Sequence, residues 1–259
     1  MKFTNIFNKA KELGIEELEL SLSSSNTLSF SIYHSKVEKY SVADNKTLYA
    51  RGIVNGKMGV ATTENLNDID SLLHDVLNNA KYIEDTKEVG IFAGSAKYAK
   101  ALKYEDKFAS IPTSEKISLA IKAEKLAFSL DSRIVEVEEV GYEEARSEQV
   151  FANTKGLKKS RKNIEGILYI NVVAKENGDV KTGLGYQLVD DYSKIDIDKI
   201  VKDAVSDATS KLNGTPCDSK KYKTILSPKA FASLISIFMS SVNGDNVNKG
   251  KSMLKDKLN

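Results

Sequence analysis

Histidine and cysteine, on which most zinc sites depend, are almost missing from this sequence. Its 259 residues contain two histidines, His34 and His74, and one cysteine, Cys217. A zinc peptidase site brings His, Cys and carboxylate ligands close together, and no local spacing pairs these three residues. We interpret both histidines as structural or surface residues and Cys217 as a small, buried or partly buried thiol in a boundary loop. The chain is therefore not expected to hydrolyse peptides by itself as a zinc protease.

Three further absences limit where the protein acts. A single thiol cannot form an internal disulfide, which fits a reducing cytoplasm. No apolar run approaches the ~20 residues that a membrane span needs, and the first residues lack the apolar core of a signal peptide. Lys and Arg number 38 against 36 Asp and Glu, a net charge of +2. That balance lacks the basic excess of a nucleic-acid binder. We expect a cytoplasmic protein that contacts neither membrane nor nucleic acid directly.

The usual nucleophile and nucleotide motifs are also absent. There is no Gly-x-Ser-x-Gly elbow and no P-loop, and the glycines 183 and 185 lack the third glycine of a dinucleotide site. The fold could still bring His34 or His74 near Cys217, but no motif supports a Cys–His pair. We assign no catalytic, cofactor-binding or metal-binding residue in this chain.

Charged side chains are plentiful, and most have a structural interpretation. Acidic residues before a predicted helix are interpreted as stabilising its N-terminus; they are Asp190, Asp191, Asp196 and Asp198. A second acidic set predicts a solvent-facing strand surface, with an acidic groove for a basic peptide as the alternative; it comprises Glu136, Glu138, Glu139, Glu143 and Glu144. The densest basic cluster is interpreted as a solvated turn or strand edge; it comprises Lys158, Lys159, Arg161 and Lys162.

The sequence passes twice through one pattern of helix, strands and helix. Alternating apolar residues predict strands, apolar residues at a 3.6-residue period predict helices, and each half contains an Asn-Gly hairpin, at 55–56 and 177–178. In the first half we predict a helix at 6–13, strands at 18–22, 28–32, 37–42, 48–54 and 58–61, and a helix at 68–82 capped by Thr63 or Asn67. In the second half we predict a helix capped by Thr113 or Ser114, strands at 134–142, 144–153, 156–164, 167–175 and 180–186, and a helix at 196–212.

This order indicates an α+β fold with duplicated helix–antiparallel strands–helix units. We predict an N-terminal α+β repeat at 1–83, a linker at 84–112 and a central α+β repeat at 113–212. Turn residues at 213–216 mark a boundary. Beyond it, 219–259 is predicted to begin a C-terminal domain, with a strand at 222–226 and a helix that starts at Pro228.

Two segments carry a resemblance to a known family. One is residues 50–63, ARGIVNGKMGVATT, and the other runs from Thr224 through Pro228 and Asp245 to Leu254. Together they resemble the TldD/PmbA family, also called modulators of DNA gyrase. The resemblance covers essentially the whole chain in order, and the second segment is the more specific. Family members are considerably longer, so the resemblance implies a C-terminally truncated protein.

The resemblance also implies where a metal would be held in relatives. In TldD-type members, the helix after the strand–Pro element carries His-Glu-x-x-x-His, whose histidines bind zinc and whose glutamate acts as base. The matching stretch here, residues 235–241, reads ISIFMSS and offers neither histidine nor glutamate. Hydroxyl and aliphatic groups do not replace imidazole as zinc ligands. This loss is typical of the PmbA branch, also called TldE-type.

The resemblance therefore implies a non-catalytic PmbA/TldE-like subunit, or a fragment of one. A TldD-type catalytic subunit would be the partner and would hold the zinc, and the complex would process or degrade unfolded or leader peptides. Homo-oligomers are a further possibility. Two alternatives stay open: an autonomous metallopeptidase of the family, and a regulatory binding module that acts on DNA gyrase.

Overall fold

The computed structural model describes residues 2–83, 90–100 and 104–257. The chain divides into two compact units, residues 1–214 and 215–259, and each is described by itself. Part of the predicted linker, residues 84–89 and 101–103, lies outside the described residues.

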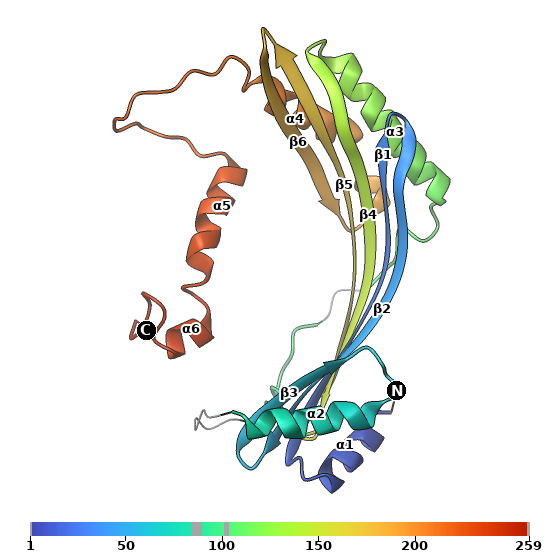
Figure 1. Ribbon diagram of the computed structural model, residues 1–259, viewed down its shortest axis with the longest axis vertical. Helices are drawn as coiled ribbons and strands as arrows, with labels where there is room; N and C mark the ends of the chain where they lie inside the picture. The colour runs from blue at the N-terminus through green and yellow to red at the C-terminus, as the bar shows by residue number, and fades with distance from the viewer. Residues whose placement is uncertain (1, 84–89, 101–103, 258–259) are drawn as a thin grey trace. The chain divides into compact units, whose positions relative to one another are not determined.

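The first unit is built on one antiparallel sheet with the strand order β3-β2-β1-β4-β5-β6 (Figure 1). Helices and strands of both halves contribute to it, as the α+β prediction requires. In chain order they are α1 (Phe3–Glu12), β1 (Glu17–Tyr33), β2 (Lys36–Val54), β3 (Lys57–Thr63), α2 (Ile69–Lys81), α3 (Thr113–Leu130), β4 (Ile134–Asn153), β5 (Lys158–Glu176), β6 (Asp179–Val189), the short 3-10 helix η1 (Tyr192–Lys194) and α4 (Ile197–Thr209).

The two halves join along the central strands β1 and β4. These strands pair without a break from Glu19 opposite Asn153 to Ile32 opposite Val140. Both predicted hairpins form, with Asn55 and Asn177 in the left-handed conformation that such turns require. Each half thus supplies three strands to a continuous sheet.

The strands are far longer than the sequence pattern predicts. The predicted strands at 37–42 and 48–54 are parts of β2, those at 134–142 and 144–153 are parts of β4, and those at 156–164 and 167–175 are parts of β5. Side chains along the first half of β2, from Lys36 to Lys46, are almost all exposed. Apolar alternation disappears where neither face is buried, although backbone pairing continues. The predicted interruptions were therefore wrong.

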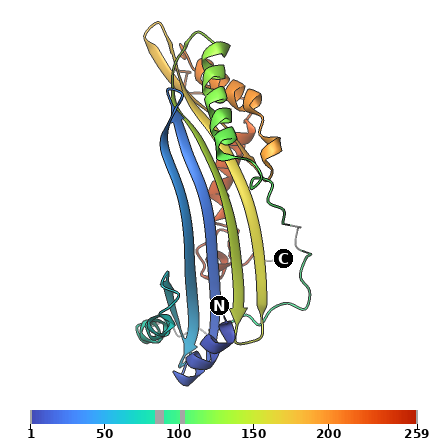
Figure 2. The same ribbon diagram turned by 90° about the vertical axis from the view of Figure 1, so that its right-hand side faces the viewer.

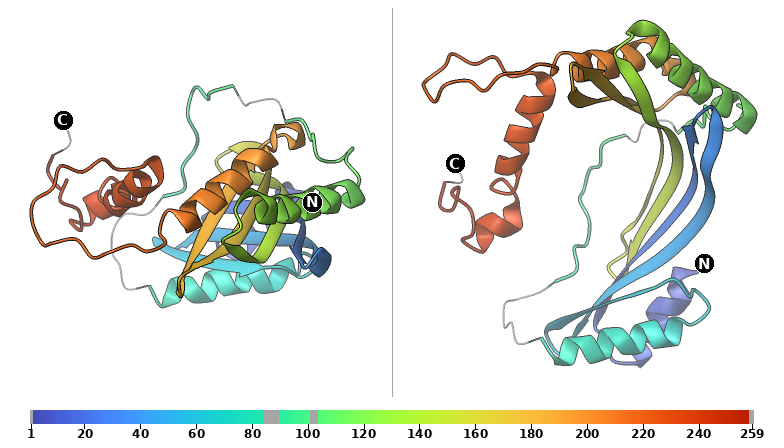
Figure 3. Two further views of the ribbon diagram at one scale, coloured as in Figure 1. Left: turned by 90° about the horizontal axis from the view of Figure 1, so that it is seen from above. Right: turned by 45° about the horizontal axis from the view of Figure 1, so that its top comes forward.

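Two hydrophobic cores lie at opposite ends of the curved sheet (Figures 2 and 3). One core packs α1 and α2 against the end that holds Leu18, Leu20 and Leu48. The other packs α3 and α4 against the end that holds Ile32 and Ile170. Between them the sheet carries mostly polar side chains, because no helix covers it there.

The same packing device joins the outer helix of each half to its edge strand. A Cβ on Gly59 of β3 would lie 1.9 Å from the Val76 carbonyl oxygen of α2. A Cβ on Gly185 of β6 would lie 1.9 Å from the Ile200 carbonyl oxygen of α4. Glycine at each position lets helix and strand backbones approach closely. This correspondence supports a structural duplication.

The helix caps differ in part from the predictions. Asp68, not Thr63 or Asn67, caps α2 by accepting a hydrogen bond from the Ser71 N–H at 3.1 Å. Pro112 occupies the N-cap position of α3, and no side chain caps that helix, so neither Thr113 nor Ser114 does so. Proline fixes an extended entry into the helix instead.

The second unit contains α5 (Pro228–Met239) and α6 (Gly244–Asn248). Helix α5 begins at Pro228 as predicted, and Ser227 caps it through the Ala230 N–H. The strand predicted at 222–226 does not form, because the described part of this unit offers no strand with which it could pair. Among the described residues, no helix is long and apolar enough to cross a membrane.

Candidate functional site

Helix α5 carries the positions at which the resemblance places a metal motif. The stretch from Ile235 to Ser241 presents aliphatic, aromatic, thioether and hydroxyl groups. Its hydroxyls are used locally: Ser236 and Ser240 donate hydrogen bonds to backbone carbonyls of α5 itself. The donor set does not fit zinc, which takes imidazole, thiolate and carboxylate ligands. No step of a metal-dependent reaction is therefore derived through this helix.

The two histidines lie at opposite ends of the sheet. His34 sits in the turn between β1 and β2, with its Nε2 3.5 Å from Glu136 Oε1. His74 lies on α2, with its Nδ1 2.9 Å from the Asp70 carbonyl oxygen. Cys217 is exposed in the second unit, so the expectation of a buried or partly buried thiol was wrong. Within the described ranges, no group of three or more His, Cys, Asp or Glu side chains has the arrangement of a metal site.

Of the four acidic residues predicted to stabilise the N-terminus of α4, Asp196 and Asp198 lie there, whereas Asp190 and Asp191 act at η1. Asp196 accepts from the Lys199 N–H at 2.9 Å and caps α4. Asp191 caps the short helix η1 through Ser193 and pairs with Lys107 at 3.0 Å. Bonds from Ser193 and then from Lys107 lower the pKa of Asp191 to about 2. These carboxylates hold loops in place.

The acidic surface predicted on β4 is wrong at one residue. Glu138 and Glu143 are exposed and Glu136 and Glu139 are half-buried, but Glu144 is only 2% exposed. The alternation of β4 turns Glu144 toward the face that α3 covers, where the equally buried Lys116 compensates its charge at 2.7 Å.

Glu144 is the centre of a buried polar network. Its Oε2 also accepts from the Tyr142 hydroxyl at 2.6 Å, and its Oε1 accepts from Arg146 Nη1 at 3.1 Å. Burial, followed by the bond to Glu144, raises the pKa of Tyr142 above its ordinary value. Lys116 donates in addition to the Phe108 carbonyl oxygen at 3.1 Å. Buried charges need such compensation, so this network is a structural clamp.

The clamp continues into the segment before α3. Arg146 Nε lies 2.5 Å from Asp106 Oδ2, and Asp106 accepts from the Phe108 and Ala109 N–H groups. Burial alone would raise the pKa of Asp106, but the bonds from Arg146 and from the backbone outweigh it and leave that pKa lowered. Phe108 is fully buried. The end of the predicted linker is therefore fixed to the sheet.

The basic cluster of β5 lies on a strand edge, as predicted. Strand β6 pairs with β5 only from Gly166 to Glu176, so residues 158–165 have a strand neighbour on one side. The Lys159 ammonium lies 4.2 Å from the Tyr98 ring centroid, and that of Lys162 lies 6.0 Å from the Tyr104 centroid. The described parts of the linker thus pass beside this edge.

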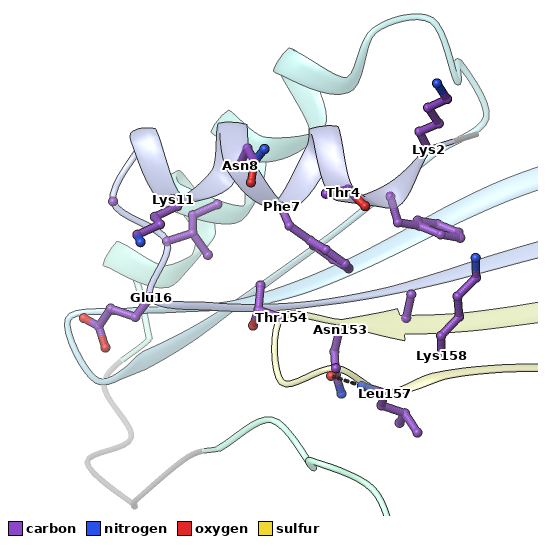
Figure 4. A pocket seen from close by; sticks show the side chains of 15 residues that line it. Lys2, Thr4, Phe7, Asn8, Lys11, Glu16, Asn153, Thr154, Leu157 and Lys158 are labelled. Atoms are coloured by element: carbon purple, nitrogen blue, oxygen red, sulfur yellow. Dashed lines mark hydrogen bonds between the residues drawn. The ribbon is translucent and has the colours of Figure 1, made fainter.

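A groove of about 930 Å³ lies between α1 and the turn that joins β4 to β5. Figure 4 shows Phe7 pointing from α1 toward Thr154 of that turn. Apolar groups of Phe3, Phe7, Ile15 and Leu157 line it. Local sequence patterns do not reveal this groove, because α1 and the turn are about 140 residues apart and no local spacing relates them.

Comparison with known protein families decides the identity of the fold. Residues 18–80 match PmbA/TldA metallopeptidase domain 1, residues 106–212 match the central domain, and residues 219–259 match the C-terminal domain. The chain belongs to the PmbA/TldD family. Among curated proteins, it is 29% identical over 147 residues to the metalloprotease PmbA homolog of Buchnera aphidicola, a match that covers 55% of this chain and 32% of that protein.

Solved structures of PmbA/TldD relatives share the fold over 99% of this chain. A candidate modulator of a DNA gyrase from Thermotoga maritima has a TM-score of 0.86 and 25% identity, with 58% of its length covered. TldE from Thermococcus kodakarensis has a TM-score of 0.85 and 19% identity, also with 58% covered. The chain spans less than two thirds of the length of each relative that it matches.

Proposed function

We propose that this PmbA/TldD-family chain is a non-catalytic, TldE-type subunit of a cytoplasmic two-component metalloprotease. A TldD-type partner holds the zinc and performs the hydrolysis, and unfolded or leader peptides are the substrates. The observation that carries the proposal is the composition of α5. From Ile235 to Ser241 the chain has no imidazole and no carboxylate, so this stretch does not supply the residues on which zinc hydrolysis depends.

The fold of TldE covers nearly the whole chain. At 19% identity this likeness is a likeness of fold, so the choice of branch rests on the side chains of α5. The apolar residues of α5, including Leu234, Ile235 and Phe238, are suited to packing against another protein surface.

Reconstitution with a TldD-type protein tests this function. We expect the two chains to copurify, an unfolded peptide to be cleaved only by the mixture, and the activity to disappear with a chelator. Elemental analysis should assign about one zinc to the partner and none to this chain, since no set of three or four zinc ligands occurs among the described residues. A mixture whose partner has its glutamate base replaced by glutamine is the matched control.

Two results would contradict the proposal. Chelator-sensitive cleavage by this chain alone would show an autonomous metallopeptidase. A salt-dependent complex with gyrase or DNA, without cleavage in the reconstituted mixture, would show a regulatory binding module instead.

A further inference from the structure

The groove between α1 and the β4–β5 turn has one fixed wall. Asn153 in that turn is only 3% exposed. Its Oδ1 accepts from the Lys155 and Leu157 N–H groups at 3.0 and 3.1 Å, and its amide donates to the Phe92 carbonyl oxygen at 2.7 Å. Next to it, the Thr154 hydroxyl accepts from the Leu18 N–H at 3.1 Å. The turn is therefore rigidly attached to the sheet before any ligand arrives.

The opposite wall of the groove is amphipathic. Phe3 and Ile15 are buried, whereas Phe7 is half-buried and points from α1 into the hollow (Figure 4). Figure 4 places Lys2 and Lys158 together at one end and Lys11 and Glu16 at the other. An aromatic surface between two charged ends is the chemistry with which proteins hold a ligand that is partly apolar and partly ionic.

The charge of the two ends differs. Lys2 and Lys158 form no ion pair with any described residue, and no carboxylate belongs to the groove at their end. At the other end, Glu16 offsets Lys11 and accepts from the Asn55 N–H at 2.8 Å. A second hollow, of about 510 Å³, shares Phe3 and Lys158 with the groove and continues along the edge of β5. The groove is thus open to an extended ligand and attracts an anion at one end.

We propose that this groove binds an extended peptide segment in which an apolar residue is followed by acidic residues. The apolar side chain lies against Phe7, and a carboxylate lies between Lys2 and Lys158. The charge and shape of the groove indicate an amphipathic anion as the ligand. The choice of a peptide among such ligands rests on the proposed function. The groove belongs to the first unit, whereas the α5 positions belong to the second.

Fluorescence anisotropy with the full chain tests the binding. The probe is a fluorescein-labelled Ser-Phe-Glu-Asp peptide, with Ser-Phe-Lys-Lys and Ser-Ser-Glu-Asp as comparisons. We expect saturable binding of the first peptide and at least about tenfold weaker binding of the other two, because one loses the charge match and the other the apolar anchor. Equal binding of all three peptides, or of laurate but not of the first peptide, would overturn the proposal.

Charge reversal localises the site. Lys158→Glu should weaken binding of Ser-Phe-Glu-Asp about tenfold or more, because an attractive contact becomes repulsive. Lys125→Glu makes the same change of charge on an exposed, unpaired lysine of α3 at the far end of the sheet, and should change the affinity less than about twofold. If both variants lose the same affinity for the peptide, binding depends only on the overall charge of the protein, and the proposed site is wrong.

Photocrosslinking gives a result that does not depend on the folding of a variant. A probe with benzoylphenylalanine in place of phenylalanine should attach to the wild-type chain at 3–15 or 153–158. Attachment mainly elsewhere would refute the groove. Because neither measurement involves a partner or zinc, their failure leaves the reconstitution test untouched, and a failed reconstitution leaves them untouched.

Discussion

Because Gly59 has no Cβ, helix α2 can pack closely against the sheet at this position. The Cβ of any other residue would lie 1.9 Å from the Val76 carbonyl oxygen and 2.9 Å from the Ala80 nitrogen, both of them backbone atoms of α2. Helix α2 must move as a body to make room, because no flexible side chain is there to yield.

We therefore expect Gly59→Ala to lower the free energy of unfolding by about 3 kcal/mol, as overpacking does in well-packed cores. Urea unfolding followed by circular dichroism measures the change. Gly90→Ala is the matched control, because a Cβ at Gly90 meets nothing within 4 Å. If both variants unfold at the same urea concentration, the close contact between α2 and β3 is wrong.

Asp191 links stability to pH. Hydrogen bonds from Ser193 and Lys107 lower its pKa to about 2 in the folded protein, against about 3.9 in an unfolded chain. A carboxyl group with a lowered folded pKa contributes stability above its unfolded pKa, and this contribution is lost as the pH falls through the folded pKa.

Between pH 5 and pH 2, the urea midpoint of Asp191→Asn should therefore fall less than that of the wild type, while at pH 7 the variant is the less stable protein. Asp75→Asn, an exposed residue of α2 with no ion pair among the described residues, should follow the wild-type pH profile. A wild-type profile for Asp191→Asn would contradict the bonds assigned to Asp191.

At the scale of elements, Arg146 is one of the residues that attach the segment before α3 to the sheet. Arg146 binds Asp106 on this segment and Glu144 on its own strand. We expect Arg146→Ala to increase amide hydrogen exchange at residues 106–111 at least about tenfold, since local opening then costs less free energy. Arg161→Ala, which removes an exposed arginine from the neighbouring strand, should leave that exchange unchanged. Equal exchange in the two variants would refute the clamp.

The elements show where the sequence suffices for prediction. Asn55 and Asn177, each followed by glycine, locate both hairpins because a two-residue turn needs positive φ angles. The apolar stripe from Leu72 to Ala80 locates α2 equally well. In contrast, the first half of β2 has almost no buried side chains. The length of β2 therefore follows from its pairing with β1, and the local sequence does not encode that pairing.

The candidate sites divide in the same way. The absence of a metal motif in α5 is visible in the sequence itself. The burial of Glu144 is not, since it depends on α3 lying across β4 and bringing Lys116 to it. The groove beside Phe7 was missed for the same reason: its walls meet only in the folded chain.

At the scale of the whole molecule, the stability of the chain resides in the first unit. Every buried apolar side chain among the described residues lies between Phe3 and Ala208. In the second unit, large apolar residues such as Phe231, Ile237 and Met239 are more than half exposed.

A chain that ends at Gly214 should therefore keep the thermal midpoint of the full chain to within about 3 °C, because it retains both cores. It should also bind less of the dye ANS, since exposed apolar surface is removed. Calorimetry and dye fluorescence measure both quantities. A shorter chain that is unfolded at 25 °C would show that the second unit contributes to the first.

The central seam of the sheet also affects how the protein is made. On a ribosome, β1 is synthesised early, and the edge that pairs with β4 has no neighbouring strand until β4 is synthesised. Thr27, for example, pairs with Ala145, which is more than 100 residues later in the chain. During that interval a nascent chain presents a long unpaired edge to every other protein nearby. Serine or threonine stands at every second position of that strand from Ser21 to Ser31. These polar side chains lower the tendency of one face of the strand to aggregate while synthesis continues.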